Sequence, residues 1–380
     1  MRYSLLGICS APSRQFGDAI PNARCIYSVF NFPRFFFPQL PRSFFLAGLL
    51  LLAACRSNPL PQPLQRFEFT SPQMGTLFRI TLYAPDESGA QAAAQSAFRR
   101  VAGLEDSMSD YQADSELIRL CDQPFGIPVP VSADLLEVLK RAQEFSALSD
   151  GAFDVTVGPY VRLWRFARKR KVLPTQTEIA NARAAVGWKK LRLDPRRRTV
   201  TLLSPNMRLD LGGIAKGYAA DQALQVLKAR GIGRALVAAS GDIAIGEAPP
   251  GQRGWKIRIS EVGARSNKVA RALLLRNAAI STSGDTEQYI EIAGVRYSHI
   301  VNPATGLGLT NRIQVTIVAP QATITDGLAT AVSVLGPKRG LALVDLLPHT
   351  AALILTKDGG ETRSFTSHGF KTIPQPEDAE

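Results

Sequence analysis

The segment that decides the fold is residues 210–221, which read DLGGIAKGYAAD. Gly212 and Gly213 directly precede a stretch with helical periodicity that extends to about Arg230 and is stopped by Gly231. A helix that begins on a glycine turn presents backbone N–H groups and the positive end of its dipole, and Lys216 adds a point charge there. Because the segment matches neither a Walker loop nor a GxGxxG fingerprint, it is consistent both with an anion site and with a tight turn beside a solvated lysine.

Length and composition outside this segment are those of a globular protein. The chain has 380 residues, of which 45% are hydrophobic and 20% charged. Strands and amphipathic helices alternate without a βαβ rhythm, so we expect a single two-lobed α+β domain whose sheets are mixed and largely antiparallel. We expect helices around 97–108, from Ser132, from the capping box Thr175–Glu178, and at 325–335 and 338–346.

The strands are predicted mostly in the second half of the chain. The expected strands cover 235–239, 255–259, 287–292, 295–300, 313–319 and 351–356, after a pair within 67–83. We expect a hairpin around Ala293-Gly294. The segments 239–243 and 281–285 are interpreted as polar, glycine-bearing turns at strand ends.

The first 65 residues form a separate prediction. An apolar run of residues 44–54 follows Arg42 and ends in Leu-Ala-Ala before Cys55, which is typical of a signal peptide with a lipidation site. The run is shorter than the roughly 20 residues that span a bilayer. The alternative is a cleaved signal with an incidental cysteine. We therefore expect a leader with a lipoprotein signal peptide at 1–54, a lipidated cysteine and Pro-rich spacer at 55–65, a compact domain at 66–372 and a polar tail at 373–380.

Cysteines and charge exclude several classes of protein. Cys9, Cys25, Cys55 and Cys121 are the four cysteines, so a mature chain that begins at Cys55 has no internal disulfide and no cysteine zinc site, and Cys121 is expected to be a small buried side chain. The net charge is +13. The basic clusters at 168–171 and 196–198 lack interleaved aromatic residues, so we expect solvated loops rather than a nucleic-acid surface.

Two further segments carry candidate chemistry. Asp326 and Thr330 are four residues apart, so on a helix both oxygens project from one face and could bind magnesium. The alternative is an N-terminal Asp that caps the helix and a Thr that bonds to its own turn. His299 lies at a predicted strand end before a proline turn, where it could be a general base, a phosphate ligand or a structural histidine.

These segments occur in an order that resembles the ApbE family of FAD:protein FMN transferases. The matching blocks are MGT at 74–76, MSDY at 108–111, GAFDVTVGP at 151–159, VGW at 186–188, DLGGIAKGYAAD at 210–221, GDI at 241–243, STSGDTEQY at 281–289, HIVNPATG at 299–306 and TDGLATAVSVLG at 325–336. The chain departs from the family at Ser240, where glycine is frequent, and at Gly327, where alanine is usual. Neither departure removes a ligand.

The resemblance implies a cleft that holds FAD, with magnesium on its pyrophosphate. It assigns metal ligation to Asp326, Thr330 and the backbone carbonyl of Ala215. The flavin contacts that it implies are Met74, Met108, Ser109, Tyr111, Asp154, Val155, Thr156, Gly212, Lys216 and His299. The expected catalytic residues are His299, Asp326 and Lys216.

The activity that the resemblance implies is magnesium-dependent transfer of FMN from FAD to a threonine of an exported flavoprotein, with release of AMP. Expected acceptors are subunits of the sodium-pumping NADH:quinone reductase or of Rnf-type complexes. The expected location is the periplasmic face of a bacterial membrane, the inner one, through the lipid on Cys55. Two alternatives remain open: a magnesium-dependent FAD pyrophosphatase that yields FMN and AMP, and a non-catalytic flavin-binding lipoprotein.

Overall fold

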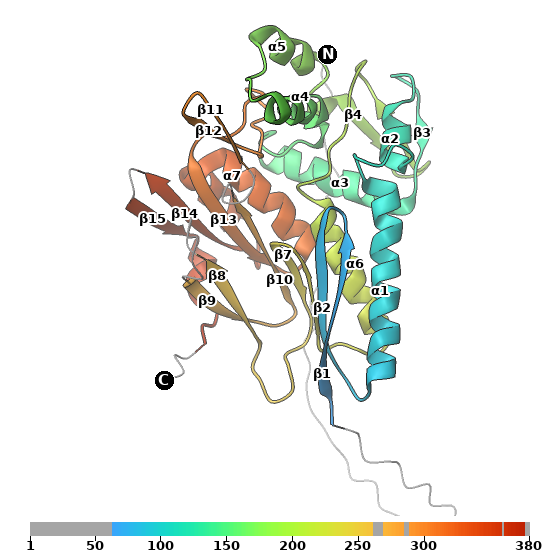
Figure 1. Ribbon diagram of the computed structural model, residues 1–380, viewed down its shortest axis with the longest axis vertical. Coiled ribbons are helices and arrows are strands. Elements are labelled where there is room, and N and C mark those ends of the chain that lie inside the picture. Colours follow the sequence, from blue (N-terminus) through green and yellow to red (C-terminus); the bar gives the residue numbers. More distant parts are fainter. Residues whose placement is uncertain (1–62, 261–268, 285–288, 359–360, 377–380) are drawn as a thin grey trace, which may run out of the picture. The chain divides into compact units, whose positions relative to one another are not determined.

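The computed structural model describes residues 63–260, 269–284, 289–358 and 361–376 (Figure 1). All of them belong to one compact unit, Pro61–Glu380. The predicted signal peptide and Cys55 lie outside the described residues. Within the described part, no helix combines the length and the apolar character that a membrane span requires.

The centre of the unit is an eight-stranded antiparallel sheet with the strand order β1-β2-β6-β7-β10-β13-β14-β15. Its strands are β1 (Gln65–Gln73), β2 (Thr76–Ala84), β6 (Ala235–Ala239), β7 (Asp242–Ile245), β10 (Ala278–Gly284), β13 (Arg312–Ala319), β14 (Ala351–Asp358) and β15 (Glu361–Thr366). Neighbouring strands in space follow one another in sequence order. The helices and small sheets are therefore insertions between strands of one meander.

The remaining described strands form three smaller antiparallel sheets. They are β3 (Val129–Pro130), β5 (Thr199–Leu202) and β4 (Leu191–Asp194); β8 (Trp255–Ser260) and β9 (Val269–Leu275); and β11 (Tyr289–Ile292) and β12 (Val295–Ser298). The last pair forms the expected hairpin, since Ala293 and Gly294 both have positive φ. The predicted α+β class with antiparallel sheets is thereby confirmed.

The helices lie in the connections between strands, and these connections differ greatly in length. The helices are α1 (Glu87–Met108), α2 (Glu116–Cys121), α3 (Ala133–Leu148), α4 (Gly158–Arg170), α5 (Gln176–Ala184), α6 (Ala215–Ala229) and α7 (Ala322–Asp345), with short 3₁₀ turns at Val155–Val157, Trp188–Lys190 and His368–Thr372. The predicted caps are present: Ser132 accepts from Leu135 N, and Thr175 and Glu178 form the capping box of α5. The two predicted helices at 325–335 and 338–346 are the halves of α7, which breaks at Gly336 (φ 73°) before Pro337.

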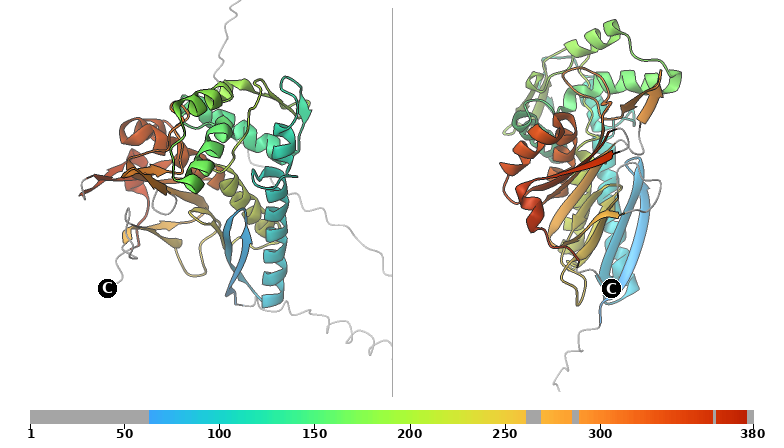
Figure 2. Two further views of the ribbon diagram at one scale, coloured as in Figure 1. Left: turned by 45° about the horizontal axis from the view of Figure 1, so that its top comes forward. Right: turned by 90° about the vertical axis from the view of Figure 1, so that its left-hand side faces the viewer.

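Both faces of the large sheet are covered, by α1, α6 and α7 on one side and by β8–β9 on the other (Figures 1 and 2). Strand β14 has apolar side chains on both faces of the sheet. Ala352 and Ile354 belong to the helix-side core, whereas Leu353 and Leu355 belong to the core under β8–β9. Side chains of a strand alternate between faces, so an unbroken apolar run is what a doubly covered strand requires.

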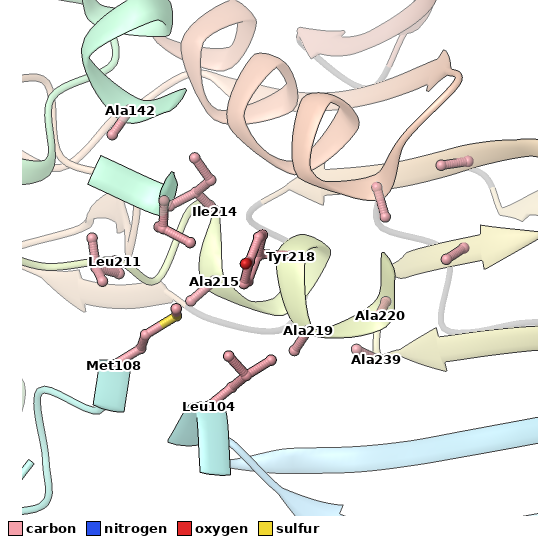
Figure 3. Close-up of a cluster of buried hydrophobic side chains, with 14 of the residues drawn as sticks. Leu104, Met108, Ala142, Leu211, Ile214, Ala215, Tyr218, Ala219, Ala220 and Ala239 are labelled. Atoms are coloured by element: carbon pink, nitrogen blue, oxygen red, sulfur yellow. The ribbon is translucent and has the colours of Figure 1, made fainter. Parts of the chain in front are cut away.

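Helix α6 lies at the middle of the helix-side core (Figure 3). Ala219 and Ala220 are fully buried and Ala215 is 5% exposed. Small side chains allow α6 to lie close to its neighbours, while Leu104 of α1 approaches from the other side (Figure 3). The glycine-turn segment chosen from the sequence is therefore a central packing element, and its first turn is fixed by the core beneath it.

Two local predictions were wrong. Residues Ser281–Gly284 are not a turn but part of β10, where Ser281 is fully buried and shares a 2.6 Å hydrogen bond with Thr325. The basic residues Arg168–Arg170 are not in a loop but form the last turn of α4, where cations favour the negative helix end. The cluster at 196–198 does lie in the exposed turn between β4 and β5.

Candidate active site

One large cleft, about 1380 Å³ in volume, brings together segments from across the chain. Its walls come from the β1–β2 turn, the end of α1, α4, the turn before α6, the first part of α7, strand β8 and the residues after β12. Pockets for small molecules typically measure roughly 300–1000 Å³. The cleft is therefore larger than a typical pocket for one small molecule.

Two glycines bring α6 and α7 together on the cleft floor. A Cβ on Gly217 would lie 2.2 Å from the carbonyl oxygen of Ala322, and a Cβ on Gly213 would lie 2.8 Å from Thr330 Oγ1. A side chain at Gly217 would meet the α7 backbone and separate the helices, and one at Gly213 would displace the Thr330 side chain. As a result, Asp326 and Thr330, one turn apart on α7, face the first turn of α6.

Asp326 is not the helix cap that the sequence left open as an alternative. Helix α7 begins at Ala322, and its first N–H groups are satisfied by Asp221 of α6, whose carboxylate accepts from Ala322 N and Thr323 N, both at 2.8 Å. Asp326 lies in the second turn and accepts from Gly217 N at 3.0 Å. Its carboxylate therefore points at α6 and into the cleft wall.

Lys216 is not solvated, contrary to one of the two readings of the sequence. Its ammonium lies 2.7 Å from Asp242 Oδ2 and 3.7 Å from Asp326 Oδ2, and it donates to Gly212 O at 3.4 Å. Burial lowers the pKa of Lys216, but the two carboxylates outweigh it and the pKa is raised overall. The lysine is thus a permanent cation inside the cleft.

Asp326 has an unusual electrostatic environment. Burial, followed by the negative charge of Asp242, raises its pKa to about 7, although Lys216 and Gly217 N oppose the shift. Both carboxylates are 5% exposed. When both buried carboxylates are ionised, the single lysine leaves a net negative charge, which favours a further cation at this point.

The oxygen atoms around Asp326 fit a hard divalent cation. The expected donor set is one carboxylate, the Thr330 hydroxyl and the Ala215 carbonyl, all in residues that line the cleft. Magnesium prefers oxygen donors and keeps positions for substrate oxygens, so a set with a single carboxylate suits it. No group of three or more His, Cys, Asp or Glu side chains in the described residues could hold a metal, and the expected set is not of that kind.

The structure gathers nearly all expected flavin contacts in the cleft. The lining includes Met74, Met108, Ser109, Tyr111, Asp154, Val155, Gly212, Lys216 and His299. Met108 is only 3% exposed, and its thioether points toward Ala215 (Figure 3). Met74 has φ 50° in the β1–β2 turn. His299 directly follows β12, the strand end that the sequence predicted.

Thr156 is the exception among the expected contacts, because it is fully buried and does not line the cleft. Its hydroxyl donates to Asp154 Oδ1 at 2.7 Å and accepts from Gly187 N. Asp154 also accepts from Trp188 N at 2.9 Å, and burial raises its pKa. The pair ties the cleft wall to the 3₁₀ turn at Trp188–Lys190, so Thr156 supports the wall from behind.

Three cleft residues were not predicted as site residues: Asp242, Asp210 and Arg165. Asp242 lies in a matching block but was interpreted only as part of a turn. Arg165 pairs with Asp110 and lies 3.6 Å from Asp210, which links α4 to both neighbouring segments. Burial and the charge of Asp110 raise the pKa of Asp210 to about 6. No spacing in the sequence signals the Arg165 contacts, which depend on how α4 packs.

Comparisons with known proteins agree with this arrangement. The family model described as the ApbE family matches residues 74–354. The chain is 33% identical to an FAD:protein FMN transferase of Vibrio cholerae, over 86% of this chain and 96% of that one, and 29% identical to one of Escherichia coli K12, over 86% and 95%.

Solved structures give the same result. The flavin transferase ApbE from Vibrio cholerae superposes with a TM-score of 0.75 at 32% identity and covers 82% of this chain and all of that one. The apo Pseudomonas stutzeri flavinyl transferase ApbE gives 0.73 at 29% identity, covering 83% and 98%. An antiparallel α+β fold with its large cleft at the α6–α7 pair defines an enzyme of the flavin-transferase class. The chain belongs to the ApbE family.

Proposed function

We propose that this protein is an FAD:protein FMN transferase that joins FMN through a phosphoester to a threonine of an acceptor protein and releases AMP. The observation that carries the proposal is the floor of the cleft, where Lys216, Asp242, Asp326 and Thr330 meet beside the start of α6. Family membership supports the same activity, because the curated relatives are named FAD:protein FMN transferases.

The transfer breaks the phosphoanhydride bond of FAD and forms a phosphoester to the threonine. The threonine oxygen forms a bond to the phosphorus on the FMN side of FAD, the bond from that phosphorus to the bridging oxygen breaks, and AMP leaves with that oxygen. His299 lines the cleft, and we assign to its imidazole the role of accepting the threonine proton. Lys216, a permanent cation, stabilises negative charge on the phosphoryl oxygens as the bonds change.

Magnesium is part of the proposal, with Asp326, Thr330 and the Ala215 carbonyl as the residues that would hold it. When bound, the ion would supply positive charge to the pyrophosphate and orient it. The chain's own contribution is to fix these oxygens: Gly217 N holds Asp326 in place, and the Gly213 contact positions Thr330. The excess negative charge of the Asp242–Asp326 pair supports a cation at this point.

The names of the curated relatives favour transfer over hydrolysis, and the size of the cleft is compatible with it. A pyrophosphatase needs space for FAD and a water molecule, whereas a transferase must also admit an acceptor side chain with its backbone. The cleft measures about 1380 Å³ and opens on residues as distant as Met74, Arg168 and Arg258. We therefore place the pyrophosphatase second, and the non-catalytic flavin-binding protein third.

The deciding experiment incubates the protein with FAD, Mg²⁺ and a candidate acceptor domain. We expect the acceptor to gain the mass of one FMN and AMP to appear in equal amount, both only with Mg²⁺ present. Free FMN with an unmodified acceptor would overturn the transferase in favour of the pyrophosphatase. FAD binding without AMP would leave only the binding protein, and an acceptor Thr→Ala variant is the matched control.

The acceptor and the location complete the proposal. We propose exported flavin-bearing subunits of sodium-pumping NADH:quinone reductase or Rnf-type complexes as acceptors. We also propose a lipid on Cys55 that holds the enzyme at the periplasmic face of the inner membrane, as the Leu-Ala-Ala-Cys ending suggests. Globomycin sensitivity of processing and labelling with a fatty-acid analogue test the anchor, and Cys55→Ser should abolish both.

A further inference from the structure

Arg165 occupies a position on the cleft rim that no part of the proposed chemistry uses. It lies in α4, and its side chain is 27% exposed. Its guanidinium pairs with Asp110, lies 3.6 Å from Asp210 Oδ2, and stacks under the Tyr111 ring with 4.0 Å from Cζ to the ring centroid. One side chain thus contacts three residues of the cleft wall.

The three contacts join two segments that are distant in the sequence. Asp110 and Tyr111 belong to the loop after α1, whereas Asp210 begins the glycine turn before α6 and accepts from Gly212 N at 2.9 Å. Arg165 therefore holds the loop against the turn that carries Lys216. A planar guanidinium can bridge two carboxylates and stack on a ring at once, which a lysine ammonium cannot do.

Tyr111 depends on this support. The residue lines the cleft with 79% of its surface exposed, and its N–H donates to Ser109 Oγ at 3.2 Å within its own loop. With Arg165 on one face of the ring, the other face is available to a planar ligand. Aromatic side chains that stack on nucleotide bases or related rings are effective only when the ring is held in place.

We propose that Arg165 is a positioning residue that presents Tyr111 as a stacking surface for the isoalloxazine ring of the flavin. The proposal rests on the proposed function for the identity of the ligand. Arg165 itself does not touch the reacting phosphorus. Its two carboxylate partners neutralise it, so it acts through the position of Tyr111 rather than as a phosphate ligand.

Flavin fluorescence provides a readout that a merely structural role would not change. A stacked tyrosine quenches the emission of FMN, so titration of the wild-type protein with FMN should quench it on binding. We expect Tyr111→Leu to lose that quenching and to raise the Kd for FMN about 10-fold. Arg165→Ala should lose most of the quenching and raise the Kd about 5-fold, because the ring is free to leave its position.

A double-mutant cycle tests whether Arg165 acts through Tyr111. The Arg165→Ala, Tyr111→Leu double variant should bind FMN no more weakly than Tyr111→Leu alone. Asp110→Asn, which keeps Arg165 but weakens its anchor, should give a partial loss of quenching, and Arg165→Lys should not restore it. Arg162→Ala, on an exposed position of the same helix, is the matched control and should behave as wild type.

The outcomes separate this inference from the proposed function. Additive losses in the double variant, or wild-type quenching in both Arg165→Ala and Asp110→Asn, would overturn the role of Arg165 while leaving FMN transfer intact. If the wild-type protein binds neither FMN nor FAD, the proposed function fails instead. Should Arg165→Ala not fold, as judged by thermal unfolding, Asp110→Asn and Tyr111→Leu still decide the question.

Discussion

The floor and the rim of the cleft are built in different ways. The floor, formed by Lys216, Asp242, Asp326 and Thr330, has carboxylates that are 5% exposed and a lysine held between them. The rim, formed by the loop Ser109–Tyr111 and the outer face of α4, carries a tyrosine that is 79% exposed. A close backbone approach of α6 to α7 fixes the floor, whereas contacts of the Arg165 side chain join the loop to α4 at the rim.

This difference indicates that the floor and the rim have different roles. The floor places charges where phosphate chemistry needs them, and it can change only if α6 and α7 move apart. The rim can change one side chain at a time with little effect on the core. We therefore expect substitutions in the floor to reduce the rate of reaction or the stability, and those in the rim to alter binding.

The largest effect should come from removal of the floor carboxylate. Asp326→Ala deletes an expected magnesium ligand and the acceptor of Gly217 N. We expect FMN transfer to fall at least about 100-fold, the range seen when a key electrostatic group is lost. The measurement is AMP release at saturating FAD and Mg²⁺, with Mn²⁺ binding by calorimetry as a second readout. Transfer within threefold of wild type would show that the floor is not the chemical centre.

The next effect concerns the contact between α6 and α7. Gly217→Ala adds a Cβ that would lie 2.2 Å from Ala322 O, so the helices must separate. We expect a loss of about 1–3 kcal/mol in the free energy of unfolding, typical of overpacking. Gly103→Ala in α1 is the control, because nothing lies within 4 Å of its Cβ and the change should stabilise the helix by about 0.5–1 kcal/mol. Equal behaviour of both variants in urea would refute the close contact.

Asp210, which joins floor to rim, should make stability depend on pH. Its pKa is raised from 3.8 to about 6, by burial and by Asp110. A raised pKa means that the folded state favours the protonated form, so this contribution to stability is complete below about pH 4 and is lost as the pH rises through 6. Relative to wild type, Asp210→Asn should therefore gain stability between pH 4 and pH 7, on the order of 2 kcal/mol. Urea midpoints at both pH values test this, and a difference independent of pH would contradict it.

The smallest effect should follow charge reversal on the rim. Arg168 lines the cleft, is exposed, and forms no ion pair with any residue that the structure describes. If the acceptor approaches over this basic edge, Arg168→Glu should raise the KM for the acceptor by less than about fivefold, with a dependence on salt, and leave FAD binding unchanged. Arg196→Glu, in the β4–β5 turn, is the control. Unchanged kinetics in both variants would exclude acceptor docking at Arg168.

Much of the floor could be predicted from the sequence because its residues lie in local motifs. The turn before α6, the Asp326–Thr330 spacing and His299 after a strand each have a local signature, and the family resemblance joined them. The capping box of α5 and the caps of α3 were predictable for the same reason. Hydrogen bonds within a few residues leave a pattern that a single sequence reveals.

Ser109 and Tyr111 of the rim were expected from the family resemblance, but the Arg165 contacts could not be predicted, because they join distant segments. Arg165 meets Asp110 across 55 positions, and neither residue belongs to a periodic pattern. Strand β10 was missed for another reason: Ser281, Thr282 and Ser283 are polar, yet hydrogen bonds to Thr325 and Thr316 satisfy the first two within the fold. Thr156 was assigned to the flavin by the family resemblance, whereas its side chain is fully buried and does not line the cleft.

Gly327, the one departure from the family within α7, limits which substitutions this sequence can accept during evolution. A Cβ at this position would lie 2.5 Å from the ring of Phe145 in α3, so the glycine leaves space for that ring. A lineage that acquired the usual alanine would first have to accept a smaller or displaced side chain at position 145. We expect Gly327→Ala to be tolerated in a Phe145→Leu background and costly without it. We therefore expect positions 145 and 327 to covary among relatives.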